Sequence, residues 1–142
     1  MPNDPRLADI LLVDDDADTR HGLALLLRGQ GYRVATAADG WQALEHMRRH
    51  GPPGLVLLDL AMPEMDGWEF LHQRRHSPDL RTVPVVVFSA VADCDGPDPR
   101  ELGAAEVLRK PVGLAEVLDA LRRYCAGEAT PDFFLTGGGR LR

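Results

Sequence analysis

The segment VPVVVF, residues 83–88, decides the fold class of this chain. It consists almost entirely of β-branched and aromatic residues and shows no alternation of polar and apolar positions. A strand with one face in water alternates, whereas a strand covered on both faces is apolar throughout, as in a parallel sheet between two layers of helices. The segment therefore predicts a central strand of a parallel sheet.

Four further apolar runs accompany this segment, and longer amphipathic segments separate them. Strands are expected at residues 10–13, 33–37, 55–58, 83–88 and 106–108. Helices are expected at residues 16–28, 39–50, 66–76 and 114–125, with Leu26 and Trp41 on their apolar stripes. This alternation predicts an α/β fold, a single doubly wound five-stranded parallel sheet in the order 2-1-3-4-5. Ligands of such sheets bind beyond the carboxyl ends of the strands, between strands 1 and 3.

The connection between the fourth and fifth strands, residues 89–104, departs from this alternation. Gly96, Pro97 and Pro99 interrupt it, and a proline inside a helix removes a backbone hydrogen bond and clashes with the preceding turn. The fourth helix is therefore expected to be shortened or irregular. At most a short turn can begin here, capped by Asp98 and with Pro99 in the first helical position.

Length and composition set outer limits on the function. The 142 residues, 44% of them apolar, suit one domain: an N-terminal arm at 1–7, a folded domain at 8–125 and a C-terminal tail at 126–142. The net charge of −6 argues against a nucleic-acid partner, which requires clustered basic residues. Because no apolar run could span a bilayer and no signal-peptide pattern is present, we expect a cytoplasmic protein without a membrane partner.

Polar residues follow four of the expected strands. Asp14 and Asp15 come after the first strand, Asp59 after the third, Ser89 after the fourth and Lys110 after the fifth. Adjacent strands lie about 4.8 Å apart, so these groups should meet at one edge of the sheet. Neighbouring carboxylates need a compensating cation, for which Mg²⁺ is suited. An added ammonium and hydroxyl suit a phosphoryl group, and a carboxylate can itself accept it.

Each of these residues also has a simpler interpretation. The acids at 14–16 could be a solvated helix start, where negative charge complements the helix dipole, and Asp16 fits best as an N-cap. Ser89 could be a turn hydroxyl and Lys110 a solvated side chain. The occurrence of all of them along a single edge favours the phosphoryl site.

Four motifs in order along the chain resemble response regulator receiver domains of two-component signalling. VLLDLAMPEMDGWEF, residues 56–70, resembles their phosphoacceptor segment. LLVDDDADTR (11–20) resembles their acidic first turn, VVVFSA (85–90) their Ser/Thr turn, and LRKP (108–111) their Lys-Pro motif. The resemblance covers residues 8–125. It implies a receiver domain with the flavodoxin-like fold, of the stand-alone, chemotaxis-regulator-like type.

The resemblance also implies the chemistry of the acidic residues. Asp59 would be phosphorylated by a sensor histidine kinase or a histidine phosphotransfer protein. A Mg²⁺ (or Mn²⁺) ion would bind Asp15, Asp59 and the backbone carbonyl of Ala61 directly, with Asp14 acting largely through water.

The remaining motif residues would bind the phosphoryl group and relay its presence. Ser89, Ala90 and Lys110 would contact the phosphoryl oxygens. Val107 stands where family members usually have an aromatic residue, three positions before the lysine, so the familiar inward turn of an aromatic ring cannot operate in the same way.

The implied function is a phosphorylation-dependent switch without an output domain, not an enzyme. It would act through contacts with an unknown downstream protein, and a weak homodimer is left open. One alternative is a phosphorylation-independent pseudo-receiver that serves as a docking module. Another is an aspartyl-phosphate phosphatase or phosphotransferase. Such enzymes need a second acid two residues after the nucleophile, where this chain has Ala61.

Overall fold

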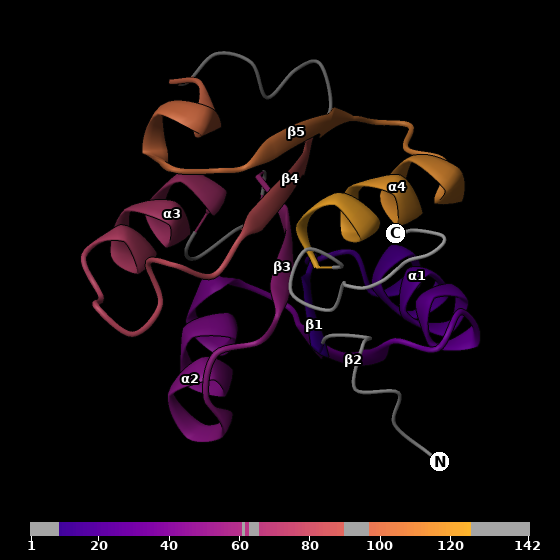
Figure 1. Ribbon diagram of the computed structural model, residues 1–142, viewed down its shortest axis with the longest axis horizontal. Coiled ribbons are helices and arrows are strands. Elements are labelled where there is room, and N and C mark those ends of the chain that lie inside the picture. Colours follow the sequence, from indigo (N-terminus) through magenta and orange to yellow (C-terminus); the bar gives the residue numbers. More distant parts are fainter. Residues whose placement is uncertain (1–8, 61, 63–65, 90–96, 126–142) are drawn as a thin grey trace, which may run out of the picture.

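A five-stranded parallel sheet with helices on both faces forms the core of the computed structural model (Figure 1). The structure describes residues 9–60, 62, 66–89 and 97–125. The strands are β1 (Asp9–Val13), β2 (Arg33–Ala37), β3 (Leu55–Asp59), β4 (Val85–Ser89) and β5 (Glu106–Arg109). The helices are α1 (Ala17–Gly29), α2 (Gly40–His50), α3 (Gly67–Arg75), the 3₁₀ helix η2 (Pro99–Leu102) and α4 (Leu114–Tyr124). The strand order is β2-β1-β3-β4-β5, which confirms the predicted doubly wound α/β fold.

The sheet separates two hydrophobic cores, because successive side chains of a strand point to opposite faces. In β3, for example, Val56 and Leu58 join the core on one face, and Leu55 and Leu57 join the core on the other. Figure 1 shows α2 and α3 on one side of the sheet and α1 and α4 on the other. The apolar strands predicted from the sequence are therefore covered on both faces.

Aspartates precede three of the α-helices. Asp39 accepts a hydrogen bond from the backbone N–H of Gln42 at 2.9 Å, and Asp66 accepts one from Glu69 at 2.9 Å. Both are side-chain N-caps, which satisfy donors that a helix start leaves unpaired. Asp16 occupies the N-cap position of α1 as predicted, but its carboxylate accepts from the hydroxyl of Thr19 and makes no cap bond to the helix backbone.

The described part of the connection between β4 and β5 contains the short helix η2. The carboxylate of Asp98 accepts from the backbone N–H of Arg100 at 3.0 Å, and Pro99 begins the helix, as predicted. Gly103 ends it with φ of 102°, a left-handed conformation that glycine adopts without strain. The indole N–H of Trp68, in α3, donates to the carbonyl of Pro97 at 2.8 Å and so links this connection to α3.

Two details of the sequence prediction were wrong. β4 begins at Val85 rather than at residue 83, because Pro84 has no N–H and the carbonyl of Val83 accepts from the guanidinium of Arg74. Leu26 was expected on the apolar stripe of its helix but is 51% exposed. Trp41, expected in the core or half-exposed, is 59% exposed. The predicted arm at 1–7 and tail at 126–142, and residues Ala61 and Ala90, lie outside the described residues. No helix in the described part of the chain combines the length and apolar character needed to cross a lipid bilayer.

Candidate functional site

Three carboxylates meet at the carboxyl edge of the sheet, where β1 and β3 lie side by side. Asp14 and Asp15 follow β1, Asp59 is the last residue of β3, and Val13 pairs with Leu58 in the register of the two strands. One carboxylate oxygen from each of Asp14, Asp15 and Asp59 lies within 4.8 Å of the others. The structure thus brings together the acids that the sequence predicted to converge.

Asp14 is the acid of the first turn that is removed from water, with 1% of its surface exposed. Its Oδ1 atom accepts from the backbone N–H of Asp16 at 2.9 Å, and the guanidinium of Arg20 donates to its backbone carbonyl at 2.7 Å. Its Oδ2 atom is buried without a hydrogen-bond partner among the described residues. Burial of a carboxylate oxygen without a hydrogen-bond donor costs free energy, and it indicates a binding site for a cation.

Asp59 lies opposite the ammonium of Lys110, which comes from the segment after β5. The Nζ atom of Lys110 is 3.3 Å from Oδ1 of Asp59, and the Asp59 carboxylate is almost fully buried. The same ammonium lies 5.2 Å from the ring centroid of Phe88, whose face attracts cations. Lys110 is the only lysine among the 16 basic residues of the chain.

Burial of these carboxylates works against their ionisation. Desolvation, followed by the neighbouring charge of Asp14, raises the pKa of Asp59 to about 7, although the ammonium of Lys110 opposes the shift. Desolvation also raises the pKa of Asp14 above its ordinary value. Without a further cation, therefore, one lysine does not compensate the charge of this acidic cluster.

Gly67 allows α3 to begin directly against the end of β3. Its backbone N–H donates to the carbonyl of Leu60 at 2.8 Å. A Cβ atom at position 67 would lie 2.7 Å from the Cα atom of Leu60 and 3.0 Å from the carbonyl oxygen of Asp59. Glycine is thus required by the close approach of two backbones next to Asp59.

Ser89 and Val107 occupy the neighbouring strands. Ser89 ends β4, is 2% exposed, and follows Phe88, which is paired with Asp59. The backbone N–H of Lys110 donates to the carbonyl of Ser89 at 2.8 Å, which fixes the turn that carries the lysine. Val107 pairs with Val87 in β5 and packs, partly buried, against the core on the α2–α3 side. Ser89 therefore lies at the end of the fourth strand and Val107 within the fifth, as predicted.

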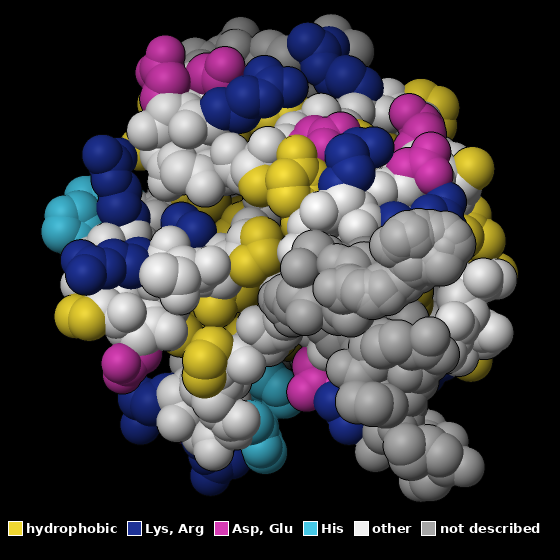
Figure 2. Space-filling model, viewed as in Figure 1, with side chains coloured by type: hydrophobic (Ala, Val, Ile, Leu, Met, Phe, Trp, Pro, Cys, Tyr) yellow, Lys and Arg dark blue, Asp and Glu magenta, His cyan; other side chains and the backbone are white. Residues whose placement is uncertain are grey.

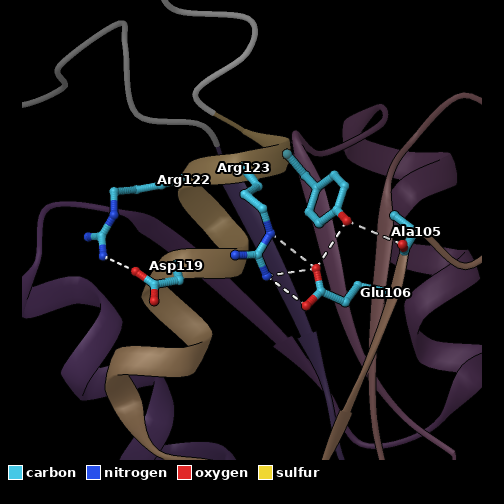
Figure 3. Close-up of polar contacts among 6 residues, drawn as sticks. Ala105, Glu106, Asp119, Arg122 and Arg123 are labelled. Atoms are coloured by element: carbon cyan, nitrogen blue, oxygen red, sulfur yellow. Dashed lines mark hydrogen bonds and ion pairs between the residues drawn. The ribbon is translucent and has the colours of Figure 1, made fainter. Parts of the chain in front are cut away.

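A second polar cluster joins β5 to α4 away from this edge (Figure 3). The carboxylate of Glu106 accepts three hydrogen bonds from the guanidinium of Arg123, at 2.6 to 3.2 Å, and one from the hydroxyl of Tyr124 at 3.0 Å. The Tyr124 hydroxyl also donates to the carbonyl of Ala105 at 3.3 Å. The bonds from Arg123 hold the pKa of Glu106 below its usual value.

The family model of the response regulator receiver domain matches residues 10–122. This chain belongs to the receiver domain family.

Individual relatives agree with this assignment. An uncharacterized 14.6 kDa protein of Leptolyngbya boryana is 37% identical over 118 residues, which make up 82% of this chain and 89% of the relative. The transcriptional regulatory protein KdpE of Mycobacterium tuberculosis is 37% identical over 114 residues, 80% of this chain, but this chain spans only 49% of its length. The crystal structure of the receiver domain of sensor histidine kinase PA1611 from Pseudomonas aeruginosa matches with a TM-score of 0.75 and 30% identity, covering 84% of this chain and 98% of that chain.

Receiver domains bind Mg²⁺ at an acidic pocket, and the PA1611 receiver structure has a magnesium ion coordinated in its active site cleft. The residues of the present receiver domain fit such an ion. Oxygen is the ligand that Mg²⁺ prefers, the three acids offer oxygens at one place, and the buried Oδ2 atom of Asp14 has no donor among the described residues. The raised pKa of Asp59 is a further sign that positive charge is in deficit there.

Sequence reasoning missed two contacts that support the edge of this receiver domain. Arg20 donates to the Asp14 carbonyl from the first turns of α1, and Phe88 lies beneath the ammonium of Lys110. The strand register would have suggested Phe88, which directly precedes Ser89. No pattern in the sequence pointed to Arg20, because a flexible side chain can reach the acidic turn from several positions of the helix.

Proposed function

We propose that this receiver domain accepts a phosphoryl group on Asp59 from the phosphohistidine of a sensor histidine kinase or a histidine phosphotransfer protein. The single observation that carries the proposal is the buried Asp59 carboxylate, facing both a lysine and two further acids. An oxygen of Asp59 attacks phosphorus, the phosphorus–nitrogen bond breaks, and its electron pair returns to the imidazole of the donor. The product is an acyl phosphate on Asp59.

The side chains around Asp59 have separate roles in this transfer. Lys110 neutralises charge on the phosphoryl oxygens, and its ammonium favours the ionised, nucleophilic form of Asp59. Ser89, through its hydroxyl, and Ala90, through its backbone, hydrogen-bond to the transferred group. These roles follow the family motif that the chain carries at each position.

The metal ligands are Asp15, Asp59 and the backbone carbonyl of Ala61, with Asp14 contributing largely through water. When bound, Mg²⁺ (or Mn²⁺) neutralises charge on the transferring phosphoryl group and orients it toward the acceptor. The exposure of Asp15 is compatible with direct ligation of an ion that keeps several waters, and the burial of Asp14 suits a residue that sets the charge of the pocket.

The signal leaves the domain through protein contacts in the cytoplasm. The surface formed by β5 and α4 is the candidate output surface, either for a downstream partner or for a weak homodimer. Val107, which stands in place of an aromatic residue, lies in β5 and packs toward the α2–α3 side. A small population shift at that surface would be sufficient.

Intact-mass measurement after incubation with a small phosphodonor and Mg²⁺ tests the proposal. We expect the wild type to gain one phosphoryl group, the Asp59→Ala variant to gain none, and the Asp16→Asn variant to behave as wild type. Asp16 is the matched control because it lies in the same acidic turn but is not one of the three acids whose oxygens converge, and its carboxylate accepts from Thr19. Labelling of Asp59→Ala would overturn the proposal by placing the phosphoryl group on another residue. No labelling of a folded wild type by either a small donor or a phosphorylated kinase would favour the pseudo-receiver instead.

A further inference from the structure

Two pairs of histidines lie on the helices of the α2–α3 face, away from the acidic edge. His46 and His50 are four residues apart in α2. His72, in α3, is four residues before His76, the C-cap residue of that helix. This spacing places both members of a pair on one side of a helix. The ring centroids of each pair are 4.5 Å apart. Figure 2 shows histidine side chains in cyan at two separate places, one at the left edge and one low in the view.

The pair on α2 lines a hollow, whereas none of the described pockets includes the α3 pair. His46 and His50 share a cavity of about 270 Å³ with Asp9 and Arg33 at the start of β1 and β2. Asp9 and Arg33 form an ion pair with each other. Asp9 is thus the acidic residue in the lining of this cavity, and the charge of its carboxylate is shared with Arg33.

The surroundings of the α2 pair suit a cation. His50 is the last residue of α2, where the unpaired carbonyls of the helix give a partial negative charge. The two arginines that precede it, Arg48 and Arg49, are both paired with Glu45, which partly offsets their charge. Burial, together with the neighbouring His50, lowers the pKa of His46, so its ring is neutral at physiological pH, as a metal ligand must be.

We propose that His46 and His50 form a binding site for a divalent transition-metal ion, with Zn²⁺ as the representative case. Imidazole suits Zn²⁺, Ni²⁺ and Cu²⁺, and two ligand nitrogens at about 2.1 Å from one ion lie roughly 3 Å apart, which rings of this separation can provide. The two histidines supply two ligands and water supplies the others. Asp9 lies on the wall of the same cavity and balances part of the ionic charge.

The α3 pair is less suited to the same role and serves as the control. The Nδ1 atom of His76 contacts the backbone carbonyl of His72 at 2.9 Å, so that only Nε2 of this ring is available to a metal ion. The surrounding basic residues Arg74 and Arg75 belong to the same last turn. Both pairs have the same spacing and ring separation, so a difference in metal binding would reflect their surroundings.

Titration of the full 142-residue chain with Zn²⁺, followed by NMR of the imidazole nitrogens, tests this site. We expect the His46 and His50 resonances to shift first, with the His72 and His76 resonances following only at higher Zn²⁺. Removal of the ligands in His46→Ala/His50→Ala should lower Zn²⁺ affinity at this site by about tenfold or more, as loss of a group supporting a metal site commonly does. The matched variant His72→Ala/His76→Ala should retain wild-type affinity.

Any binding of Zn²⁺ by the acidic edge is common to all these variants and cancels in the comparison. His50→Ala alone provides a substitution at an exposed position that leaves the fold intact. It should weaken binding while its melting temperature without metal equals that of the wild type. Equal Zn²⁺ affinity in wild type and His46→Ala/His50→Ala would overturn the proposal, as would an equal loss in His72→Ala/His76→Ala. The site is independent of Asp59, so its failure leaves the phosphoacceptor proposal untouched.

Discussion

In two ion pairs of this receiver domain, the pKa of the carboxylate is shifted in opposite directions. At the carboxyl edge, Asp59 contacts Lys110 and nevertheless has its pKa raised to about 7. At the β5–α4 corner, Glu106 contacts Arg123 and has its pKa lowered. Asp59 is buried beside another acid and receives one long contact, whereas Glu106 is nearer to solvent and receives four hydrogen bonds.

The contrast separates a completed ion pair from an incomplete one. Arginine presents a planar fork that satisfies a carboxylate by itself, whereas lysine is a single point charge that leaves other carboxylate oxygens open. The Glu106–Arg123 ion pair thus joins β5 to α4, and its carboxylate is fully hydrogen-bonded. The edge is left short of positive charge, which a bound metal ion would supply.

Removing Lys110 should have the largest effect on stability, because it takes the counter-charge from one of these two ion pairs. We expect Lys110→Met to lower the free energy of unfolding by about 2 kcal/mol near neutral or higher pH without metal, because the buried acids then lose their counter-charge. Lys110 is partly exposed, which keeps the effect below that of a fully buried pair. Urea unfolding in the presence of a chelator measures it, with Lys110→Arg as the charge-conserving control. Equal stability of wild type and Lys110→Met would show that the ammonium does not compensate the edge.

Removing the negative charge of Asp59 should instead raise the free energy of unfolding. The folded pKa of Asp59 lies above its unfolded value of 3.8, so its ionisation favours unfolding, beginning above that value and fully developed above about 7. We therefore expect Asp59→Asn to raise the free energy of unfolding by about 1–2 kcal/mol at about pH 8 without metal. The gain should shrink as the pH falls toward 4. Chemical unfolding across this pH range measures it, and a destabilised variant at pH 8 would contradict the raised pKa.

Addition of Mg²⁺ should stabilise the wild type, and this stabilisation should depend on Asp59 and not on Glu106. A ligand that binds only the folded state adds about 1 kcal/mol when it is present at about five times its dissociation constant. We expect Mg²⁺ to raise the melting temperature of the wild type accordingly and to have little effect on Asp59→Asn. The Glu106→Gln variant, changed at the other pair, should respond to Mg²⁺ as the wild type does. A Mg²⁺ response preserved in Asp59→Asn would place the ion elsewhere.

Breaking the satisfied pair should have the smallest effect. Because Arg123 is half exposed, we expect Glu106→Gln to lower the free energy of unfolding by only about 0.5–1 kcal/mol at neutral pH. The folded pKa of Glu106 lies below its ordinary 4.5, so the stabilisation is present above that value and disappears as the pH falls through the folded pKa. Thermal unfolding of both proteins at neutral and acidic pH measures the difference. A gap that widens in acid would contradict the assignment.

The order of the elements and the acidic edge could be predicted because both depend on local patterns. Apolar runs fix the strands, and parallel strands bring their carboxyl ends to one edge, so Asp14, Asp59 and Lys110 had to converge. The starts of α2 and α3 followed from aspartates with suitable spacing. Even the reduced fourth helix was visible in its prolines and glycine.

What escaped prediction depends on contacts between residues far apart in the chain. Arg74 lies buried in bonds to the carbonyls of Val83 and Arg81, and nothing in a helical pattern distinguishes it from a solvated arginine. Leu26 and Trp41 fit apolar stripes by periodicity but remain exposed, because periodicity does not show how much of a stripe the neighbouring elements cover. The state of ionisation at the edge likewise required knowledge of burial, which the order of residues does not contain.

The hydrogen bond from Trp68 to Pro97 makes the intrinsic fluorescence of Trp68 a probe of the connection between β4 and β5. Its indole is tied to the connection that precedes η2, two residues beyond the N-cap of α3. The other tryptophan, Trp41, is 59% exposed on α2 and should contribute a steady, solvent-like emission. Changes in fluorescence on adding a phosphodonor would therefore report mainly on Trp68, without any dye attached to the chain.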